Sequence, residues 1–211
     1  MTRTEILDKI FTHKLMAILR ISESQKVLPT AKAIMEAGIE VLEITLNSAN
    51  ALDHIKHLRK NSPANTLIGA GTVISSKDTA NAAKSGAQFI VTPIFKEEII
   101  ETAHEHGIPV FMGAMTPTEI LMAWEAGADV IKVFPANAMG IGYFKAVKGP
   151  LSQIPLMPTG GVNIDNAKEW ISLGAVALGL GGSLVNKEDL ELEAYDKIKT
   201  KAINFLQHIH Q

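Results

Sequence analysis

Short apolar runs recur along the chain at a nearly constant spacing, and this repeat limits the folds open to it. Eight such runs begin 20 to 26 residues apart. They are Leu15–Arg20, Val41–Leu46, Leu67–Gly71, Phe89–Pro93, Pro109–Gly113, Val130–Pro135, Ile154–Gly160 and Ala175–Gly179. Runs of this length, separated by loops and amphipathic stretches, are typical of strands that alternate with helices. Such an alternation indicates a parallel sheet whose strands are covered on both faces.

The stretches between the runs have the periodicity of amphipathic helices. The clearest are Gln25–Ala37, Asn50–Arg59, Lys77–Ser85, Lys96–His106 and Thr118–Ala126. Four of them end at a glycine, the residue that most easily closes a last helical turn in the left-handed conformation: Gly38, Gly86, Gly107 and Gly127. Two further helices are expected, at Thr2–Phe11 before the first run and at Leu190–His208 after the last.

Eight strand–helix units without a long linker predict one domain over residues 1–211, an α/β fold of the (β/α)8 (TIM) barrel type with an extra N-terminal helix. The length of 211 residues fits this fold, which usually takes about 200–250 residues. An open, doubly wound sheet is the alternative.

Composition excludes several classes of function. The chain carries 20 Lys and Arg against 22 Asp and Glu, a formal net charge of −2, so no nucleic-acid partner is expected. It has no cysteine, which rules out disulfides and thiolate sites and suits a reducing compartment. No segment resembles a signal peptide or an apolar span of about 20 residues. We therefore expect a cytoplasmic protein without a membrane partner.

Two of the predicted strands have a charged residue in their interior. Glu43 lies in Val41–Leu46 and Lys132 lies in Val130–Pro135. The two-residue period of a strand places Glu43 on the same face as Thr45, and Lys132 on the same face as Phe134. Burying a charge costs several kcal/mol, so these residues form either a structural ion pair or a reactive site.

A reactive site is favoured because both charges lie toward the carboxyl ends of their strands, where barrel enzymes have their active sites. A lysine in a dry pocket loses its proton easily, and its free amine attacks ketones. A nearby glutamate can transfer protons. The pair therefore predicts Schiff-base chemistry on a keto acid, and Arg20 at the end of the first strand could bind a carboxylate or phosphate.

Glycine pairs follow the last two predicted strands. Pro158-Thr159-Gly160-Gly161 ends the seventh, and Gly179-Leu180-Gly181-Gly182-Ser183 follows the eighth. Barrels often bind phosphate with the loops at these two places, because glycines let backbone N–H groups approach an anion. Two tight turns without a ligand are the alternative.

Two other patterns are rejected as binding motifs. The segment Gly69–Ile74 begins like a dinucleotide-binding fingerprint but lacks its third glycine. None of the seven histidines has the spacing of a zinc site. The sequence therefore predicts neither a metal nor any other cofactor.

Taken together, these segments resemble the 2-keto-3-deoxy-6-phosphogluconate (KDPG) and 4-hydroxy-2-oxoglutarate (KHG) aldolases, over nearly the whole chain. The most specific matches are Ile131-Lys132-Val133-Phe134-Pro135 and Pro158-Thr159-Gly160-Gly161-Val162. The other matches are Ala17–Arg20, Leu42–Thr45, Gly69–Val73 and Val91–Pro93.

This resemblance implies a metal-free class I aldolase, usually a homotrimer, that cleaves KDPG to pyruvate and glyceraldehyde 3-phosphate and also acts on 4-hydroxy-2-oxoglutarate. Lys132 would form the imine and Glu43 would be the general acid and base. The substrate-binding residues would be Arg20, Thr45, Asn47, Thr72, Pro93, Phe134, Thr159, Gly160, Gly161, Gly181, Gly182 and Ser183. Among these, Arg20, Thr72 and Pro93 would line the keto-acid end, and the glycine loops would hold the phosphate.

Three alternatives remain open. Asn47 stands where some family members have arginine. The segment Leu46-Asn47-Ser48-Ala49 is similar to the Leu-Asn-Ser-Pro of the 6-phosphogalactonate aldolases, which cleave the C4 epimer, whereas Thr159 before the glycine pair is similar to the gluconate and hydroxyglutarate type. A phosphosugar isomerase on the same barrel would use acid and base groups without an imine. A sugar-phosphate sensor without catalysis would not need a buried Lys132.

Overall fold

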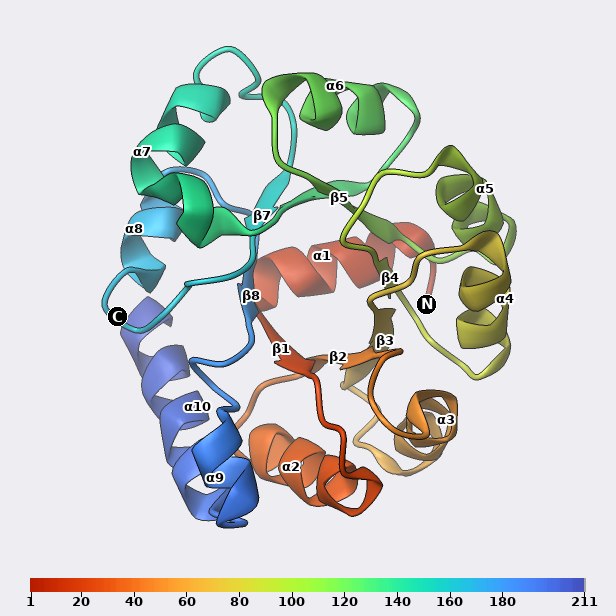
Figure 1. Cartoon of the computed structure of the whole chain (residues 1–211), viewed down its shortest axis with the longest axis vertical. Coiled ribbons are helices and arrows are strands. Elements are labelled where there is room, and N and C mark those ends of the chain that lie inside the picture. The colour runs from red at the N-terminus through yellow and green to blue at the C-terminus, as the bar shows by residue number, and fades with distance from the viewer. Residues whose placement is uncertain (211) are drawn as a thin grey trace.

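The computed structural model describes residues 1–210 and consists of one ring of eight parallel strands surrounded by helices (Figure 1). The strands are β1 (Leu15–Leu19), β2 (Val41–Thr45), β3 (Leu67–Gly71), β4 (Ile90–Val91), β5 (Val110–Ala114), β6 (Val130–Val133), β7 (Leu156–Pro158) and β8 (Leu178–Leu180). Each of them lies within the apolar run that predicted it, except that β5 and β8 each extend one residue beyond their runs.

The strands pair in the order β7-β6-β5-β4-β3-β2-β1-β8, always in parallel. Between β7 and β8 the ring closes through only two isolated bridges, Leu156 with Ala175 and Thr159 with Gly179. The prediction of a (β/α)8 barrel is confirmed, and the open-sheet alternative is wrong.

Ten helices accompany the strands in residues 1–210. They are α1 (Arg3–His13), α2 (Ser24–Glu36), α3 (Ala51–Asn61), α4 (Ser76–Lys84), α5 (Glu97–Glu105), α6 (Pro117–Glu125), α7 (Ala136–Lys148), α8 (Ala167–Ser172), α9 (Lys187–Glu191) and α10 (Tyr195–His210). The expected N-terminal helix is confirmed as α1, which starts with a capping box between Thr2 and Glu5. None of these helices has the length and apolar character that a membrane span needs.

The prediction of one helix over Leu190–His208 is wrong, because the chain there forms α9 and α10 with a turn between them. Glu193 in that turn has φ of 50°, a left-handed conformation that ends a helix. The four glycines predicted to close helices are confirmed in positive φ: Gly38, Gly86, Gly107 and Gly127.

Two hydrophobic cores hold the barrel together. The larger core lies between the strands and the outer helices. The smaller one fills the inside of the barrel with alternate strand residues such as Val41, Phe111 and Val130, and α1 adds Ile6 and Ile10 to it. Figure 1 shows α1 lying across the ring of strands. One end of the barrel is thereby plugged with apolar side chains, which leaves the other end for chemistry.

Candidate active site

Glu43 and Lys132 point into the barrel, one layer beyond its inner core. Each follows an inner-core residue by two positions, Val41 on β2 and Val130 on β6, and so shares its face. Lys132 is 4% exposed and Glu43 is 0% exposed. Both oxygens of Glu43 lack a hydrogen-bond partner among the described residues. An unpartnered buried carboxyl group is costly, and such groups are concentrated at functional sites.

Burial shifts the protonation of both groups toward their neutral forms. It raises the pKa of the Glu43 carboxyl above its ordinary value, although the positive charges of Lys132 and Arg20 oppose this. Burial likewise lowers the pKa of the Lys132 ammonium; the charge of Glu43 opposes that shift and Arg20 adds to it. The amine is thus easier to deprotonate than an ordinary lysine, and the carboxyl group holds a proton more readily.

Glycines in three strands leave room for groups around the site that a side chain would otherwise block. A Cβ atom on Gly71 of β3 would lie 1.8 Å from Oε1 of Glu43. A Cβ on Gly113 of β5 would lie 2.2 Å from the carbonyl carbon of Pro93, and one on Gly179 of β8 would lie 2.3 Å from Oγ1 of Thr159. The glycines of β3, β5 and β8 thus leave room for the Glu43 carboxyl group, the Pro93 backbone and the Thr159 hydroxyl group.

A cavity of about 520 Å³ opens next to Lys132, and it gathers most of the predicted site residues. Its lining contains Arg20, Lys132, Phe134, Thr159, Gly160, Gly161, Gly181, Gly182 and Ser183. The Nζ atom of Lys132 lies 5.2 Å from the centre of the Phe134 ring, within cation–π range. The cavity thus places an amine, a guanidinium group and two glycine loops around one space.

The glycine loops at this cavity combine left-handed backbone with unpartnered hydroxyl groups. Gly160 and Gly161 have φ of 93° and 75°, a conformation that L side chains rarely adopt. The hydroxyl oxygens of Thr159 and Ser183 are buried and have no hydrogen-bond partner among residues 1–210. Both residues line the cavity, so their hydroxyl groups and the loop N–H groups are available to a ligand such as a phosphate.

Five predicted residues lie outside the lining of this cavity: Glu43, Thr45, Asn47, Thr72 and Pro93. The hydroxyl of Thr45 is 3.2 Å from the carbonyl oxygen of Leu19, and Asn47 is exposed on the loop after β2. Thr72 has φ of 56°, which for a β-branched residue costs about 1–3 kcal/mol and is commonest at functional sites. Their contact with a substrate stays a prediction.

Sequence reasoning did not select several residues that the structure brings to the site. Asn163, which follows Val162 in the loop after β7, lines the cavity with an amide side chain. Ser48 is buried, and its Oγ lies 3.0 Å from the backbone nitrogen of Ile21, the residue after Arg20. A single Asn or Ser in a loop has no periodicity, and only its neighbours in space make it stand out.

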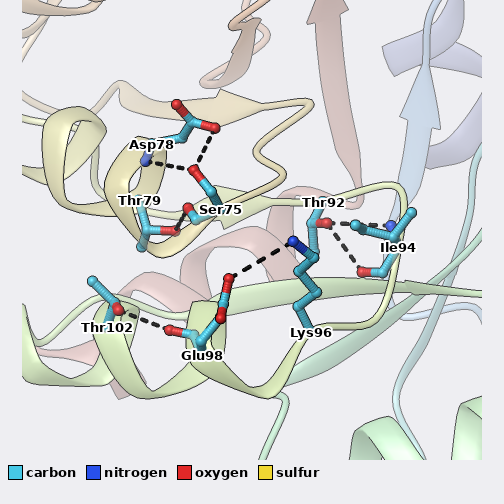
Figure 2. Close-up of polar contacts among 8 residues, drawn as sticks. All are labelled: Ser75, Asp78, Thr79, Thr92, Ile94, Lys96, Glu98 and Thr102. Carbon is cyan, nitrogen blue, oxygen red and sulfur yellow. Dashed lines mark hydrogen bonds and ion pairs between the residues drawn. The ribbon is translucent and has the colours of Figure 1, made fainter.

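The loops after β3 and β4 are held in shape by short-range hydrogen bonds (Figure 2). The Ser75 hydroxyl accepts from the Asp78 N–H at 3.1 Å and donates to the Asp78 carboxylate at 2.8 Å. The Thr92 hydroxyl donates to the carbonyl oxygen of Ile94 at 3.0 Å. These loops present Ile74 and Ile94 to the surface, 50% and 39% exposed, so both apolar side chains are held outward by ordered backbone.

Nowhere in residues 1–210 do three or more His, Cys, Asp or Glu side chains gather as a metal site would require. The donors around the cavity are an amine, a guanidinium group, hydroxyls and backbone amides, which suit an anionic organic substrate rather than a cation.

The comparisons with known proteins agree with this chemistry. The sequence model of the KDPG and KHG aldolase family matches residues 6–201. The KHG/KDPG aldolase of Escherichia coli is 34% identical over 198 residues, covering 93% of this chain and 92% of that one. The 2-dehydro-3-deoxy-6-phosphogalactonate aldolase of the same species is 39% identical over 171 residues, covering 81% and 83%.

Among solved structures, the KDPG aldolase of Legionella pneumophila superposes with a TM-score of 0.85 at 29% identity, covering 92% of this chain and 95% of that one. That protein was crystallised with pyruvate captured as a covalent carbinolamine. The family match spans nearly the whole barrel, including Glu43, Lys132 and both glycine loops. The chain belongs to the KDPG and KHG aldolase family.

Proposed function

We propose that this protein is a class I aldolase that cleaves KDPG into pyruvate and glyceraldehyde 3-phosphate, and that it also cleaves 4-hydroxy-2-oxoglutarate into pyruvate and glyoxylate. The observation that carries the proposal is the buried amine of Lys132 with the unpartnered carboxyl group of Glu43 near a cavity lined by two glycine-rich loops. An isomerase or a sensor would not need that buried amine. The captured carbinolamine in the Legionella relative supports the same chemistry.

The reaction starts with the neutral amine of Lys132 attacking the C2 ketone. The carbinolamine that forms loses water and becomes a protonated imine, which can accept an electron pair. Because burial lowers the pKa of Lys132, the amine is available at lower pH than that of an exposed lysine. Phe134 packs near the Lys132 nitrogen and helps to exclude water from it.

Carbon–carbon cleavage follows from proton transfer to Glu43. Its carboxylate removes the proton of the C4 hydroxyl, and the C4 oxygen forms the aldehyde carbonyl as the C3–C4 bond breaks. The electron pair of that bond forms a C2=C3 double bond, and the π pair of the protonated imine moves onto its nitrogen. The aldehyde leaves, and an enamine of pyruvate remains on Lys132. Glu43 then returns its proton to C3, and water hydrolyses the imine to release pyruvate and the free amine. Burial suits Glu43 to both steps, because it raises the pKa of the carboxyl group toward neutral pH.

The two ends of the substrate would bind at opposite sides of the cavity. The Arg20 guanidinium can bind the carboxylate in two parallel hydrogen bonds, with Thr72 and Pro93 near that end. The phosphate would be bound by the hydroxyl groups of Thr159 and Ser183 together with backbone N–H groups of the glycine loops. In this proposal the whole chain acts as one barrel domain.

The second candidate substrate is the galactonate epimer, 2-keto-3-deoxy-6-phosphogalactonate. It is favoured by Asn47 and by the 39% identity with the E. coli aldolase for that substrate. A hydroxyl contact made or lost discriminates epimers by about ten- to a hundredfold, so we expect cleavage of both with kcat/KM values within about a hundredfold. Asn47→Ala should bring the kcat/KM values for the two epimers closer together. If the ratio of these values does not change, Asn47 is not the residue that discriminates the epimers.

We further propose that the protein forms a homotrimer, as the family resemblance implies. Support comes from apolar side chains exposed on α6 and on the loops after β3 and β4, namely Ile74, Ile94, Leu121 and Met122. Contiguous exposed apolar patches commonly mark interfaces, and we expect these four side chains to lie in the trimer contact. Analytical ultracentrifugation at several protein concentrations would measure the oligomeric state, and we expect the mass of a trimer. A cytoplasmic location stays a prediction of the sequence.

The imine is tested by trapping. The protein is incubated with pyruvate and borohydride, digested, and mapped by mass spectrometry, and we expect the added mass on Lys132. Lys132→Arg should prevent labelling and abolish turnover, because a guanidinium group stays protonated.

Lys148 provides a matched control lysine. Burial lowers its pKa too, but its Nζ donates to the carbonyl oxygens of Ser152 and Ile154 on the outer side of the barrel. Lys148→Arg should keep the label on Lys132. A label on Lys148, on any other lysine, or on none would overturn the proposal.

A further inference from the structure

Arg20 has no side-chain partner to hold it in place. Its side chain lines the cavity and is exposed, and among residues 1–210 no hydrogen bond or ion pair reaches the guanidinium. Arginine has a long side chain with about 2 kcal/mol of rotamer entropy. A guanidinium that binds a substrate in a fixed direction must therefore be aimed by the backbone from which it extends.

The backbone on both sides of Arg20 is held by the hydroxyl group of Ser48. The Ile21 N–H donates to Oγ of Ser48 at 3.0 Å, and the same Oγ lies 3.3 Å from the carbonyl oxygen of Leu19. Ser48 also lies 3.0 Å from Oγ1 of Thr45, whose hydroxyl reaches the same Leu19 oxygen at 3.2 Å. The two peptide groups that flank Arg20 thus meet at one buried hydroxyl.

Ser48 is only 6% exposed, so water does not replace this hydroxyl easily. The loop that carries it is itself fixed, because the Ser48 N–H donates to the carbonyl of Thr45 and the Ala49 N–H donates to the carbonyl of Ile21. We name the contacts of Ser48 and Thr45 with Leu19 and Ile21 the Ser48 clamp.

We infer that Ser48 is a positioning residue for Arg20: the Ser48 clamp joins the end of β2 to the end of β1 and directs the guanidinium toward the carboxylate of the bound keto acid. Ser48 acts through the backbone and does not itself line the cavity. The inference rests on the proposed role of Arg20 and adds a residue outside the cavity that controls substrate affinity. Its effect should fall on binding rather than on the later chemical steps.

The test is a double-mutant cycle of Ser48→Ala and Arg20→Met, read by the pyruvate concentration that gives half-maximal borohydride labelling of Lys132. Ser48→Ala should raise that concentration about five- to tenfold, the value of one buried hydrogen bond, and change the maximal labelling rate less than about threefold. In the Arg20→Met background, Ser48→Ala should shift the half-maximal pyruvate concentration less than about twofold, because the guanidinium group that Ser48 positions is absent.

Thr30→Ala is the control for a purely structural loss. The Thr30 side chain on α2 is also buried and donates to the carbonyl of Lys26 at 2.7 Å, outside the cavity lining. It should lower the melting temperature without shifting the half-maximal pyruvate concentration. If Ser48→Ala leaves that concentration unchanged, or shifts it equally with and without Arg20, the inference is wrong.

A second measurement separates this inference from the proposed function. Amide hydrogen exchange of Ile21, followed by NMR in the absence of substrate, should speed up about tenfold in Ser48→Ala. Unchanged exchange would mean that Ser48 does not hold the segment. If the proposed function fails instead, the wild-type protein itself is not labelled at Lys132, whatever Ile21 shows.

Discussion

Replacing Gly71 by alanine should disable the general acid and base without preventing imine formation. The new Cβ atom would lie 1.8 Å from Oε1 of Glu43, against 3.4 Å for an ordinary contact, so the carboxyl group must move by about 1.6 Å. A displacement of about 1 Å at a reacting group can cost about a hundredfold in rate, and a general acid–base group contributes about 10²–10⁴-fold. We therefore expect kcat to fall at least about a hundredfold.

The assay compares two steps of the reaction in one variant. Turnover of KDPG is followed by coupled detection of pyruvate, and labelling of Lys132 by pyruvate with borohydride reports imine formation. Gly71→Ala should lose turnover of KDPG but keep the rate of Lys132 labelling within about fivefold of the wild-type rate. In a Glu43→Gln background, Gly71→Ala should lower kcat by less than about threefold more, because the displaced group no longer transfers protons.

Gly69→Ala is the matched control on the same strand. Its Cβ would lie 2.2 Å from the ring of Phe89, in the apolar layer beneath the site. Overpacking there should cost about 1–3 kcal/mol of stability, seen in denaturant unfolding, while kcat stays within about fivefold. The reasoning is refuted if Gly71→Ala keeps wild-type kcat, or if Gly69→Ala lowers kcat just as much.

Three further predictions concern Lys132, the phosphate loops and metal independence. Because burial lowers the pKa of Lys132, the fraction of neutral amine grows as the pH rises through a range below the ordinary pKa of 10.5. The rate of labelling by pyruvate and cyanoborohydride should therefore reach its plateau below pH 10.5. A labelling rate that still rises through pH 10.5 would contradict the lowered pKa. Ser183→Ala should raise KM for phosphorylated substrates about tenfold and spare 4-hydroxy-2-oxoglutarate, and equal harm to both would place the phosphate elsewhere. Full activity should survive EDTA, since the imine accepts the electron pair that a Lewis acid would otherwise stabilise; a loss that zinc restores would exclude this mechanism.

The barrel could be predicted from the sequence because parallel strands covered on both faces leave continuous apolar runs. The same rule made Glu43 and Lys132 conspicuous, since a charge inside such a run has few structural explanations. The helix ends at Gly38 and Gly127 were equally readable, because glycine is favoured where a helix closes in the left-handed region.

What escaped prediction depends on contacts between distant segments. The break between α9 and α10 occurs at Glu193, whose residue type gives no sign of a positive φ. The space for Glu43 on β2 depends on Gly71 of the neighbouring strand β3. The Ser48 clamp depends on a contact between Ser48 and Ile21, which lie 27 residues apart in the chain. No local pattern records either relation.

The sparse pairing of β7 with β8 has a consequence for how ligand binding affects the fold. The other neighbouring strands pair within the named sheet, the shortest pairing being the single pair Ala70 with Ile90 between β3 and β4, whereas β7 and β8 are joined only by two isolated bridges. The loops that follow these two strands are the ones that would bind the phosphate, so an anion between them would connect the two sides of this weak joint as a removable cross-link. In the protein without substrate, local opening of the barrel should therefore begin between β7 and β8. Bound substrate should suppress this opening, because substrate binding and closure of the barrel are then thermodynamically linked.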